Sequence, residues 1–163
     1  MGNYLSYVPH SIRPQKRVMI FGLPDSGKTS LLYWLKFGKQ VETAPTIGIN
    51  QEDIVYDTIS TVTMDFGICD YISYKDKADV VIYVVGTDKL EDVKPHFHSV
   101  VSAAPILILA NKQDLVDKSH THVSTIQALN FWDLECEWKC IPTVISQGIG
   151  IGSIRAWVSK HIS

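Results

Sequence analysis

The sequence predicts an α/β fold with a mostly parallel central sheet and helices on both of its faces. Continuous apolar runs, which are typical of buried parallel strands, alternate along the 163 residues with segments of helical periodicity. A glycine-rich phosphate-loop motif stands between the first such strand and the first helix, and an Asn-Lys-Gln-Asp motif directly follows a later strand. Hydrophobic residues make up 45% of the chain and charged residues 20%, so a packed core is expected rather than disorder.

The organising stretch is residues 22–29, GLPDSGKT, which fits the phosphate-loop pattern G-x-x-x-x-G-K-[ST]. The apolar run 17–21 before it predicts a buried strand, and residues 30–36 after it predict a helix. In that context the loop N–H groups would point at phosphate oxygens, Lys28 would reach the β- and γ-phosphates, and the Thr29 hydroxyl would bind Mg²⁺. The predicted phosphate-binding residues of this segment are Gly22, Asp25, Ser26, Gly27, Lys28, Thr29 and Ser30.

The rest of the chain is predicted to continue the alternation of strands and helices. Residues 49–56 and 59–64 predict a β-hairpin, with a tight turn at Asp57 and Thr58. Further strands are expected at 80–85, 105–110 and 139–145, and helices at 89–104, 123–129 and 153–162. We expect one domain over residues 17–163, preceded by an N-terminal arm at 1–16.

The motif at residues 111–114 follows a buried strand, so it should lie at the carboxyl edge of the sheet, where ligands bind in open α/β folds. The Asp114 carboxylate can accept hydrogen bonds from the amino and ring N–H groups of guanine, a pair of donors that adenine does not offer. Asn111 can satisfy the purine edge, and the stem of Lys112 can cover the base. Together with an upstream phosphate loop, this motif predicts a guanine-nucleotide site.

With these motifs in place, the chain resembles the small GTPases, most closely the ADP-ribosylation-factor branch. The matching stretches are residues 22–33, 45–50 (PTIGIN), 65–67 (DFG) and 111–115 (NKQDL), together with the Met-Gly-Asn start. The resemblance implies the small-GTPase fold with one antiparallel hairpin, and GTP or GDP bound with Mg²⁺. It also implies that Thr46 joins Thr29 on Mg²⁺ and touches the γ-phosphate, and that Asp65 holds the ion through a water.

The same resemblance has two further implications. Ser146 and Gln147 lie just before Gly148, where the family has its last base-contacting loop, although these two residues match the family only loosely. The hairpin at 49–64 would be the segment that slides as the N-terminal arm moves to a membrane.

The second switch departs from the family. The pattern D-x-G-G-Q is replaced by Asp65-Phe66-Gly67-Ile68-Cys69. In the direct register, Ile68 replaces the glycine whose N–H meets the γ-phosphate, and Cys69 replaces the glutamine that orients the attacking water. If one residue is deleted instead, Gly67 serves as that glycine and Ile68 fills the glutamine position. Both registers leave no glutamine, so weak GTP hydrolysis is expected.

Two functions remain open at this point. The first is a guanine-nucleotide switch or adaptor that hydrolyses GTP slowly and binds effector and exchange proteins. The second is a pseudo-GTPase interaction module that binds the same kinds of partner without a productive nucleotide cycle. The net charge of −2 argues against general nucleic-acid binding.

The first six residues, MGNYLS, match the myristoylation pattern M-G-x-x-x-[ST] at Gly2. An acylated arm predicts a peripheral protein on the cytoplasmic face of a membrane, and the alternative is a frayed terminus whose second residue happens to be glycine. Three cysteines and no secretory signal are consistent with a reducing compartment. His96 and His98 lie two apart in a predicted helix and are expected to be solvated or capping residues rather than metal ligands.

Overall fold

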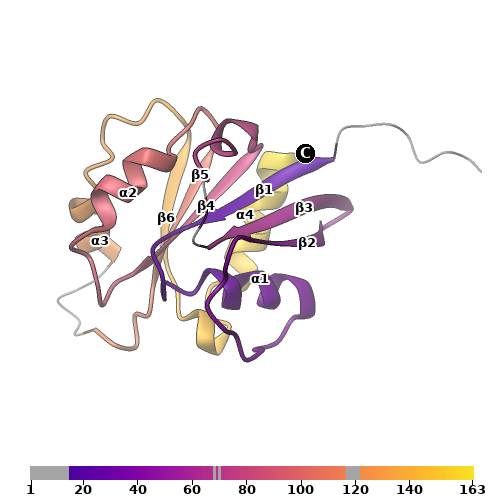
Figure 1. Ribbon diagram of the computed structural model, residues 1–163, viewed down its shortest axis with the longest axis horizontal. Coiled ribbons are helices and arrows are strands. Elements are labelled where there is room, and N and C mark those ends of the chain that lie inside the picture. The colour runs from indigo at the N-terminus through magenta and orange to yellow at the C-terminus, as the bar shows by residue number, and fades with distance from the viewer. Residues whose placement is uncertain (1–14, 68, 70, 117–121) are drawn as a thin grey trace, which may run out of the picture.

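The computed structural model describes residues 15–67, 69, 71–116 and 122–163. Its centre is a six-stranded sheet with the order β2-β3-β1-β4-β5-β6 (Figure 1). The strands are β1 Lys16–Phe21, β2 Ile49–Tyr56, β3 Ile59–Phe66, β4 Val80–Gly86, β5 Ile106–Asn111 and β6 Trp138–Pro142. The helices are α1 Lys28–Phe37, α2 Val93–Val100, α3 His122–Leu129 and α4 Ile151–Ile162, with short 3₁₀ turns at Lys75–Lys77 and Ile145–Gln147.

Only the β2–β3 pair is antiparallel among the neighbouring strands of this sheet, and β3, β1, β4, β5 and β6 run parallel. The predicted α/β fold with one antiparallel hairpin is therefore confirmed. Parallel strands must have both faces covered, and β4 and β5 accordingly consist of buried residues along their whole length.

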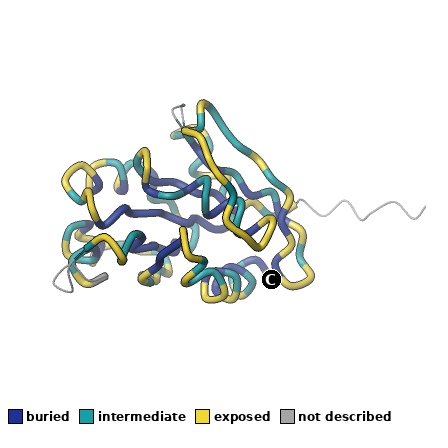
Figure 2. The backbone as a smooth tube through the Cα atoms, turned by 90° about the horizontal axis from the view of Figure 1, so that it is seen from below, coloured by how far each residue is buried: buried dark blue, intermediate teal, exposed yellow. Residues whose placement is uncertain are grey.

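Helices cover the two faces of the sheet and produce two apolar clusters. On one face, α1 and α4 pack on alternate strand residues through side chains such as Leu32 and Val158. On the other, α2 and α3 pack through Phe97 and Leu129. The central strands form the buried middle layer, and the exposed residues lie mainly in the surrounding loops and on the outer sides of the helices (Figure 2).

Two predicted elements are shorter than expected. The helix expected at 89–104 is confined to Val93–Val100. Pro95 is tolerated because it lies in the first turn of the helix. Pro105 disfavours helical geometry in the residue before it, and residues 101–104 connect the helix to β5 with a bend at 103–104. The strand expected at 139–145 ends at Pro142, and residues 145–147 form a 3₁₀ turn instead.

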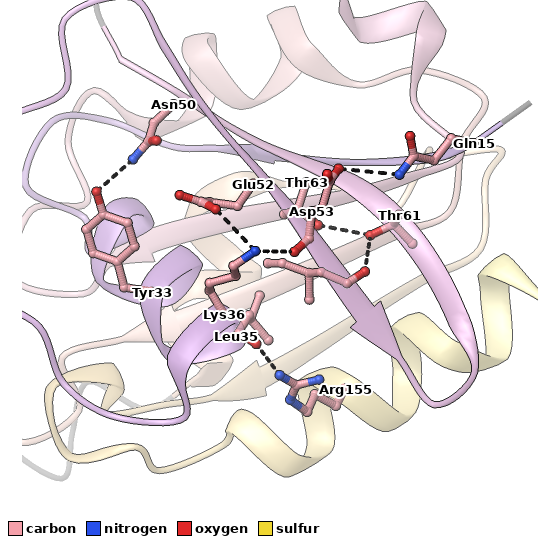
Figure 3. Close-up of polar contacts among 11 residues, drawn as sticks. Gln15, Tyr33, Leu35, Lys36, Asn50, Glu52, Asp53, Thr61, Thr63 and Arg155 are labelled. Atoms are coloured by element: carbon pink, nitrogen blue, oxygen red, sulfur yellow. Dashed lines mark hydrogen bonds and ion pairs between the residues drawn. The ribbon is translucent and has the colours of Figure 1, made fainter.

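The β2–β3 hairpin is held against α1 and α4 by cationic side chains (Figure 3). The Lys36 ammonium lies 3.4 Å from the Glu52 carboxylate and donates to the Asp53 carbonyl at 2.7 Å. The Arg155 guanidinium donates to the carbonyl of Val55 at 3.0 Å and also to that of Leu35, so it joins α4 to β2 and to α1. These contacts hold the hairpin in place. The second switch, which begins at Asp65, follows from the carboxyl end of the hairpin.

No helix in the described ranges combines the length and the apolar character that crossing a bilayer would require.

Candidate nucleotide-binding site

The carboxyl ends of the parallel strands bring the sequence motifs together at one edge of the sheet. The phosphate loop follows β1, Asp65 is the penultimate residue of β3, and Asn111 is the last residue of β5. The loop that carries Ser146 and Gln147 follows β6. This is the edge at which doubly covered α/β sheets bind ligands, because the helix N-termini and the connecting loops meet there.

The phosphate loop is shaped by a glycine that no other residue can replace without strain. Gly27 has a φ of 105°, and a Cβ placed there would lie 2.5 Å from the Asn111 amide nitrogen. The loop turns through a hydrogen bond from the Ser26 N–H to the Leu23 carbonyl at 3.3 Å. The helix α1 then begins at Lys28, with its N-terminal end at the loop, which favours an anion there.

Lys28 is a nearly buried cation within this loop. Its side chain donates to the Leu23 carbonyl at 3.0 Å, and the residue is only 7% exposed. Burial lowers the pKa of the ammonium, and the nearby carboxylates of Asp65 and Asp25 oppose that shift. A buried ammonium gains most from an anion placed beside it, and phosphate oxygens would supply one.

Three oxygens that the sequence assigned to Mg²⁺ converge in the structure. The Thr29 hydroxyl lies 2.5 Å from Asp65 Oδ2 and 2.9 Å from the Thr46 hydroxyl, which is itself 3.1 Å from Asp65 Oδ2. Asp65 is fully buried, and its other oxygen, Oδ1, has no hydrogen-bond partner among the described residues. Hydroxyl and carboxylate oxygens are the ligands that Mg²⁺ accepts, so this donor set fits the ion.

Gly67 allows the loop that carries Thr46 to lie directly over the end of β3. A Cβ at Gly67 would stand 2.0 Å from the Thr46 carbonyl oxygen, so no side chain fits there. The Gly67 N–H donates to the Gly48 carbonyl at 2.9 Å. This close approach places Thr46 against Asp65, although the two residues are 19 positions apart in the chain.

A cavity of about 470 Å³ extends over the phosphate loop and beneath the Thr46 segment. Lys28, Thr29 and Thr46 line one part of it, and Cys69 and His96 line another. Cys69 thus lines the same cavity as the phosphate loop. Ile68 lies outside the described residues, so the choice between the two registers stays open.

On the base side, Asn111 stands before the loop that carries Asp114 and joins the phosphate loop to the loop after β6. Its Nδ2 donates to the Ser26 carbonyl at 2.8 Å, and its Oδ1 accepts from the Thr143 hydroxyl at 3.2 Å and the Ile145 N–H at 3.0 Å. The residue is only 3% exposed. We expected Asn111 to contact the purine edge. Its amide also holds the loops around the base site, and one of its N–H groups stays available for that contact.

The remaining predicted base-contacting residues lie on the loops that Asn111 joins. Asp114, Ser146 and Gln147 are exposed, as residues that meet a ligand should be. Lys112 has a positive φ of 65°, and its ammonium pairs with Asp88 at 3.1 Å, an ion pair that the sequence did not predict.

The other phosphate-loop predictions differ in exposure. Asp25 is exposed, has a φ of 62° and lies 4.0 Å from Lys89. The Ser26 hydroxyl is buried without a hydrogen-bond partner in the described part of the chain, and Ser30 is half-buried in the first turn of α1 and lines the cavity. Gly2, the predicted acylation site, lies outside the described residues.

Sequence reasoning missed His96 as a residue of this site. The structure gives the two helical histidines different surroundings: His96 Nδ1 lies 2.7 Å from the Tyr83 hydroxyl, whereas His98 Nε2 lies 3.1 Å from the Leu129 carbonyl. No group of three or more His, Cys, Asp or Glu side chains in the described ranges is arranged to hold a metal. The sequence carries no signal for the position of His96, because it depends on how α2 packs beside Tyr71.

The class of protein that this fold and site define is a phosphate-loop nucleotide-binding protein with the small-GTPase fold. The chain belongs to the ADP-ribosylation factor family, whose model matches residues 4–162. ADP-ribosylation factor F of Dictyostelium discoideum is 31% identical over 166 residues, which cover 90% of this chain and 85% of that protein. ADP-ribosylation factor 3 of Arabidopsis thaliana is 33% identical over 162 residues, with 91% and 88% covered.

Solved structures support the fold. The Arl6 BBS3 small GTPase from Trypanosoma brucei, solved with the bound nucleotide analogue GppNp, matches with a TM-score of 0.74 at 21% identity, covering 90% of this chain and 96% of that one. A chain from the structure of the mammalian SRP receptor matches with a TM-score of 0.76 at 19% identity, covering 89% and 99%. At these identities the likeness concerns the fold alone.

Replacing Asn111 with Asp should destabilise the protein, because a carboxylate oxygen would then face the Ser26 carbonyl in place of an N–H donor. We expect the free energy of unfolding to fall by about 1–3 kcal/mol, the usual effect of leaving a buried acceptor unpaired. Urea unfolding without added nucleotide or Mg²⁺ measures this. The control is Asn130→Asp, which makes the same chemical change at an exposed residue. Equal stability of the two variants would contradict the assigned role of Asn111.

Proposed function

We propose that the protein is a guanine-nucleotide-dependent switch that binds GTP and GDP with Mg²⁺ and hydrolyses GTP slowly. The observation that carries the proposal is the convergence of Thr29, Thr46 and Asp65 beside the buried ammonium of Lys28. Membership of the ADP-ribosylation factor family supports the same conclusion. The GppNp bound to the similar Trypanosoma brucei GTPase is consistent with it.

In this proposal the phosphate end of the nucleotide lies over α1. Lys28 and the N–H groups of the loop bind the phosphate oxygens, and burial strengthens these contacts because water does not screen them. Thr29, Thr46 and Asp65 would hold Mg²⁺, which supplies positive charge to the β- and γ-phosphates when bound. Thr46 belongs to the loop before β2, so its position would depend on the presence of a γ-phosphate.

At the base end, selection of guanine would rest on Asp114. A carboxylate can accept from both the amino and the ring N–H groups of guanine, whereas adenine would leave it without these donors. The Asn111 network would hold the surrounding loops in place for this contact, and Lys112, Ser146 and Gln147 would complete the base site.

The substitution at the second switch favours slow hydrolysis. Hydrolysis of a phosphate bond by water depends on placing the nucleophile, since the protein supplies little covalent chemistry. The Cys69 thiol is a weak donor and a weak acceptor, and in the other register Ile68 has no polar group at all. This substitution also favours the second candidate, a pseudo-GTPase interaction module, and the measured rate separates the two.

Binding should be selective for guanine, and Asp114→Asn should reduce that selectivity. For wild type we expect GTP and GDP to displace a fluorescent guanine nucleotide at least a hundredfold better than ATP, since unpaired buried polar groups cost a few kcal/mol. For Asp114→Asn the preference should fall by about tenfold or more. The matched control is Asp133→Asn, at an exposed carboxylate outside the site motifs. Equal displacement by ATP and GTP in wild type would reject the proposal.

Restoring the family pattern should raise hydrolysis. In single-turnover phosphate release from preloaded GTP, we expect Ile68→Gly combined with Cys69→Gln to be faster than wild type by up to about a hundredfold, the effect of placing a reacting group correctly. Cys69→Ala serves as the control, because it removes the thiol without adding an amide, and it should stay near the wild-type rate. A wild-type rate equal to that of a glutamine-containing relative would contradict slow hydrolysis.

We also propose that the N-terminal arm attaches the protein to the cytoplasmic face of a membrane through a myristoyl group on Gly2. The motif at residues 1–6 supports this, and the apolar side chains near it would add to the affinity. A single myristoyl chain gives only marginal, reversible binding, so an effect of additional residues in the arm is expected.

Co-expression with an N-myristoyltransferase should add one acyl chain and move the protein onto liposomes, and Gly2→Ala should abolish both changes. Mass spectrometry and liposome sedimentation measure them. Gly152→Ala is a matched control, because Gly152 lies in α4 with open space around its Cα and should tolerate a methyl group. Sedimentation that is the same with and without Gly2 would show that the arm is not anchored by acylation.

A further inference from the structure

His96 and Tyr83 form a hydrogen-bonded pair at the wall of the phosphate cavity. His96 comes from α2 and lines the same cavity as Lys28 and Thr46. Its ring packs against two tyrosines, with centroid distances of 5.1 Å to Tyr71 and 5.7 Å to Tyr83. The ring orientation is thus held by packing on two sides and by the 2.7 Å contact between Nδ1 and the Tyr83 hydroxyl.

The direction of that hydrogen bond follows from the burial of Tyr83. The residue is 0% exposed, and burial raises the pKa of its hydroxyl far above neutrality, so the hydroxyl keeps its hydrogen. A buried hydroxyl must donate to some acceptor, and the acceptor that the described residues provide is His96 Nδ1. Nδ1 therefore carries the lone pair in this pair of residues.

The other ring nitrogen must then carry the hydrogen. Burial, together with the positive charge of Lys28, lowers the pKa of His96, which favours the neutral ring at physiological pH. A neutral imidazole with its lone pair on Nδ1 has its N–H at Nε2. None of the hydrogen bonds within the described part of the chain uses Nε2, so the ring offers a donor to a ligand in the cavity that it lines.

The position of His96 indicates which part of a bound nucleotide its ring would contact. His96 packs against Tyr71, and the cavity that both line is also lined by Gly67, Cys69, Thr29 and Thr46. The base loops around Asp114 belong to the opposite end of the site. In the proposed binding mode, a donor at this wall would meet the terminal phosphate of a triphosphate, which a diphosphate lacks.

We propose that His96 is a specificity-determining residue that recognises the γ-phosphate, with Nε2–H donating a hydrogen bond to a γ-phosphate oxygen that GDP lacks. This inference rests on the proposed binding of guanine nucleotides. It assigns His96 a binding role and no part as a base, because a nitrogen that carries a hydrogen cannot accept one from the attacking water. In the direct register, where Ile68 replaces the family's glycine that senses the same phosphate, the His96 side chain would compensate for that substitution.

The test compares the affinities for GppNp and GDP, each measured by displacement of a fluorescent GDP analogue in the presence of Mg²⁺. His96→Ala should weaken GppNp binding by roughly tenfold or more, the effect of losing a hydrogen bond to a charged group, and leave GDP binding within about twofold. The matched control is His98→Ala on the same helix, whose ring contacts α3 and not the cavity. It should leave the ratio of the two affinities unchanged.

Two further variants test whether the effect of His96→Ala arises from the lost hydrogen bond or from misfolding. His96→Gln keeps an N–H donor and should retain part of the preference for GppNp. Tyr83→Phe keeps the ring but removes the hydroxyl that holds the hydrogen on Nε2, so it should lower GppNp affinity less than His96→Ala does. Nitrogen-15 shifts of the imidazole in the wild-type protein should show an unprotonated Nδ1 and a protonated Nε2.

The possible outcomes are distinct. If wild type binds both nucleotides and His96→Ala changes neither affinity, or changes both equally, the role of His96 is overturned and the proposed function stands. A protonated Nδ1 in the neutral ring would also overturn it. If wild type binds no guanine nucleotide, the proposed function fails and this inference fails with it.

Discussion

The site depends first on the amide of Asn111. This one side chain bonds the phosphate loop, through the Ser26 carbonyl, to the loop after β6, through Thr143 and Ile145. Ser26 lies 85 residues before Asn111 in the chain, and the amide is buried where water cannot replace a lost partner. The Asn111 amide therefore sets the position of the phosphate end of the site relative to the base end. Both its nitrogen and its oxygen form hydrogen bonds.

The residues of the phosphate-loop, PTIG and NKQD motifs also hold the structure together. Thr29 and Thr46 donate to Asp65, and Asn111 joins loops, so each of these residues contributes to the structure besides its proposed role in ligand binding. Their presence in a chain that lacks the catalytic glutamine is therefore explained by folding and by nucleotide binding together.

The sequence predicted those parts of the site whose geometry is local. The phosphate loop, the presence of a helix directly after it and the hairpin after Gly48 follow from glycine positions, apolar periodicity and turn residues that are close together in the chain. The helix α2 was predicted too long, because periodicity alone does not show that it begins at Val93 and ends at Val100, before Pro105.

The residues that the sequence did not place depend on packing between distant elements. His96 reaches the cavity because α2 lies over β4 beside Tyr71, an arrangement that no spacing in the sequence encodes. The role of Asn111 has the same origin: the motif marks the residue, but its partners at Ser26 and Ile145 become neighbours only when the sheet order is known.

The cations that hold the hairpin have an effect on association between molecules. β2 is the strand at one edge of the sheet. An edge strand has backbone N–H and C=O groups that can pair with a strand of another chain. Asp53 and Val55 lie two residues apart, so their carbonyls point the same way, and Lys36 and Arg155 occupy both of them. A strand from a second molecule would have to displace these charged donors first. The contacts that locate the hairpin thus also protect this edge against edge-to-edge aggregation.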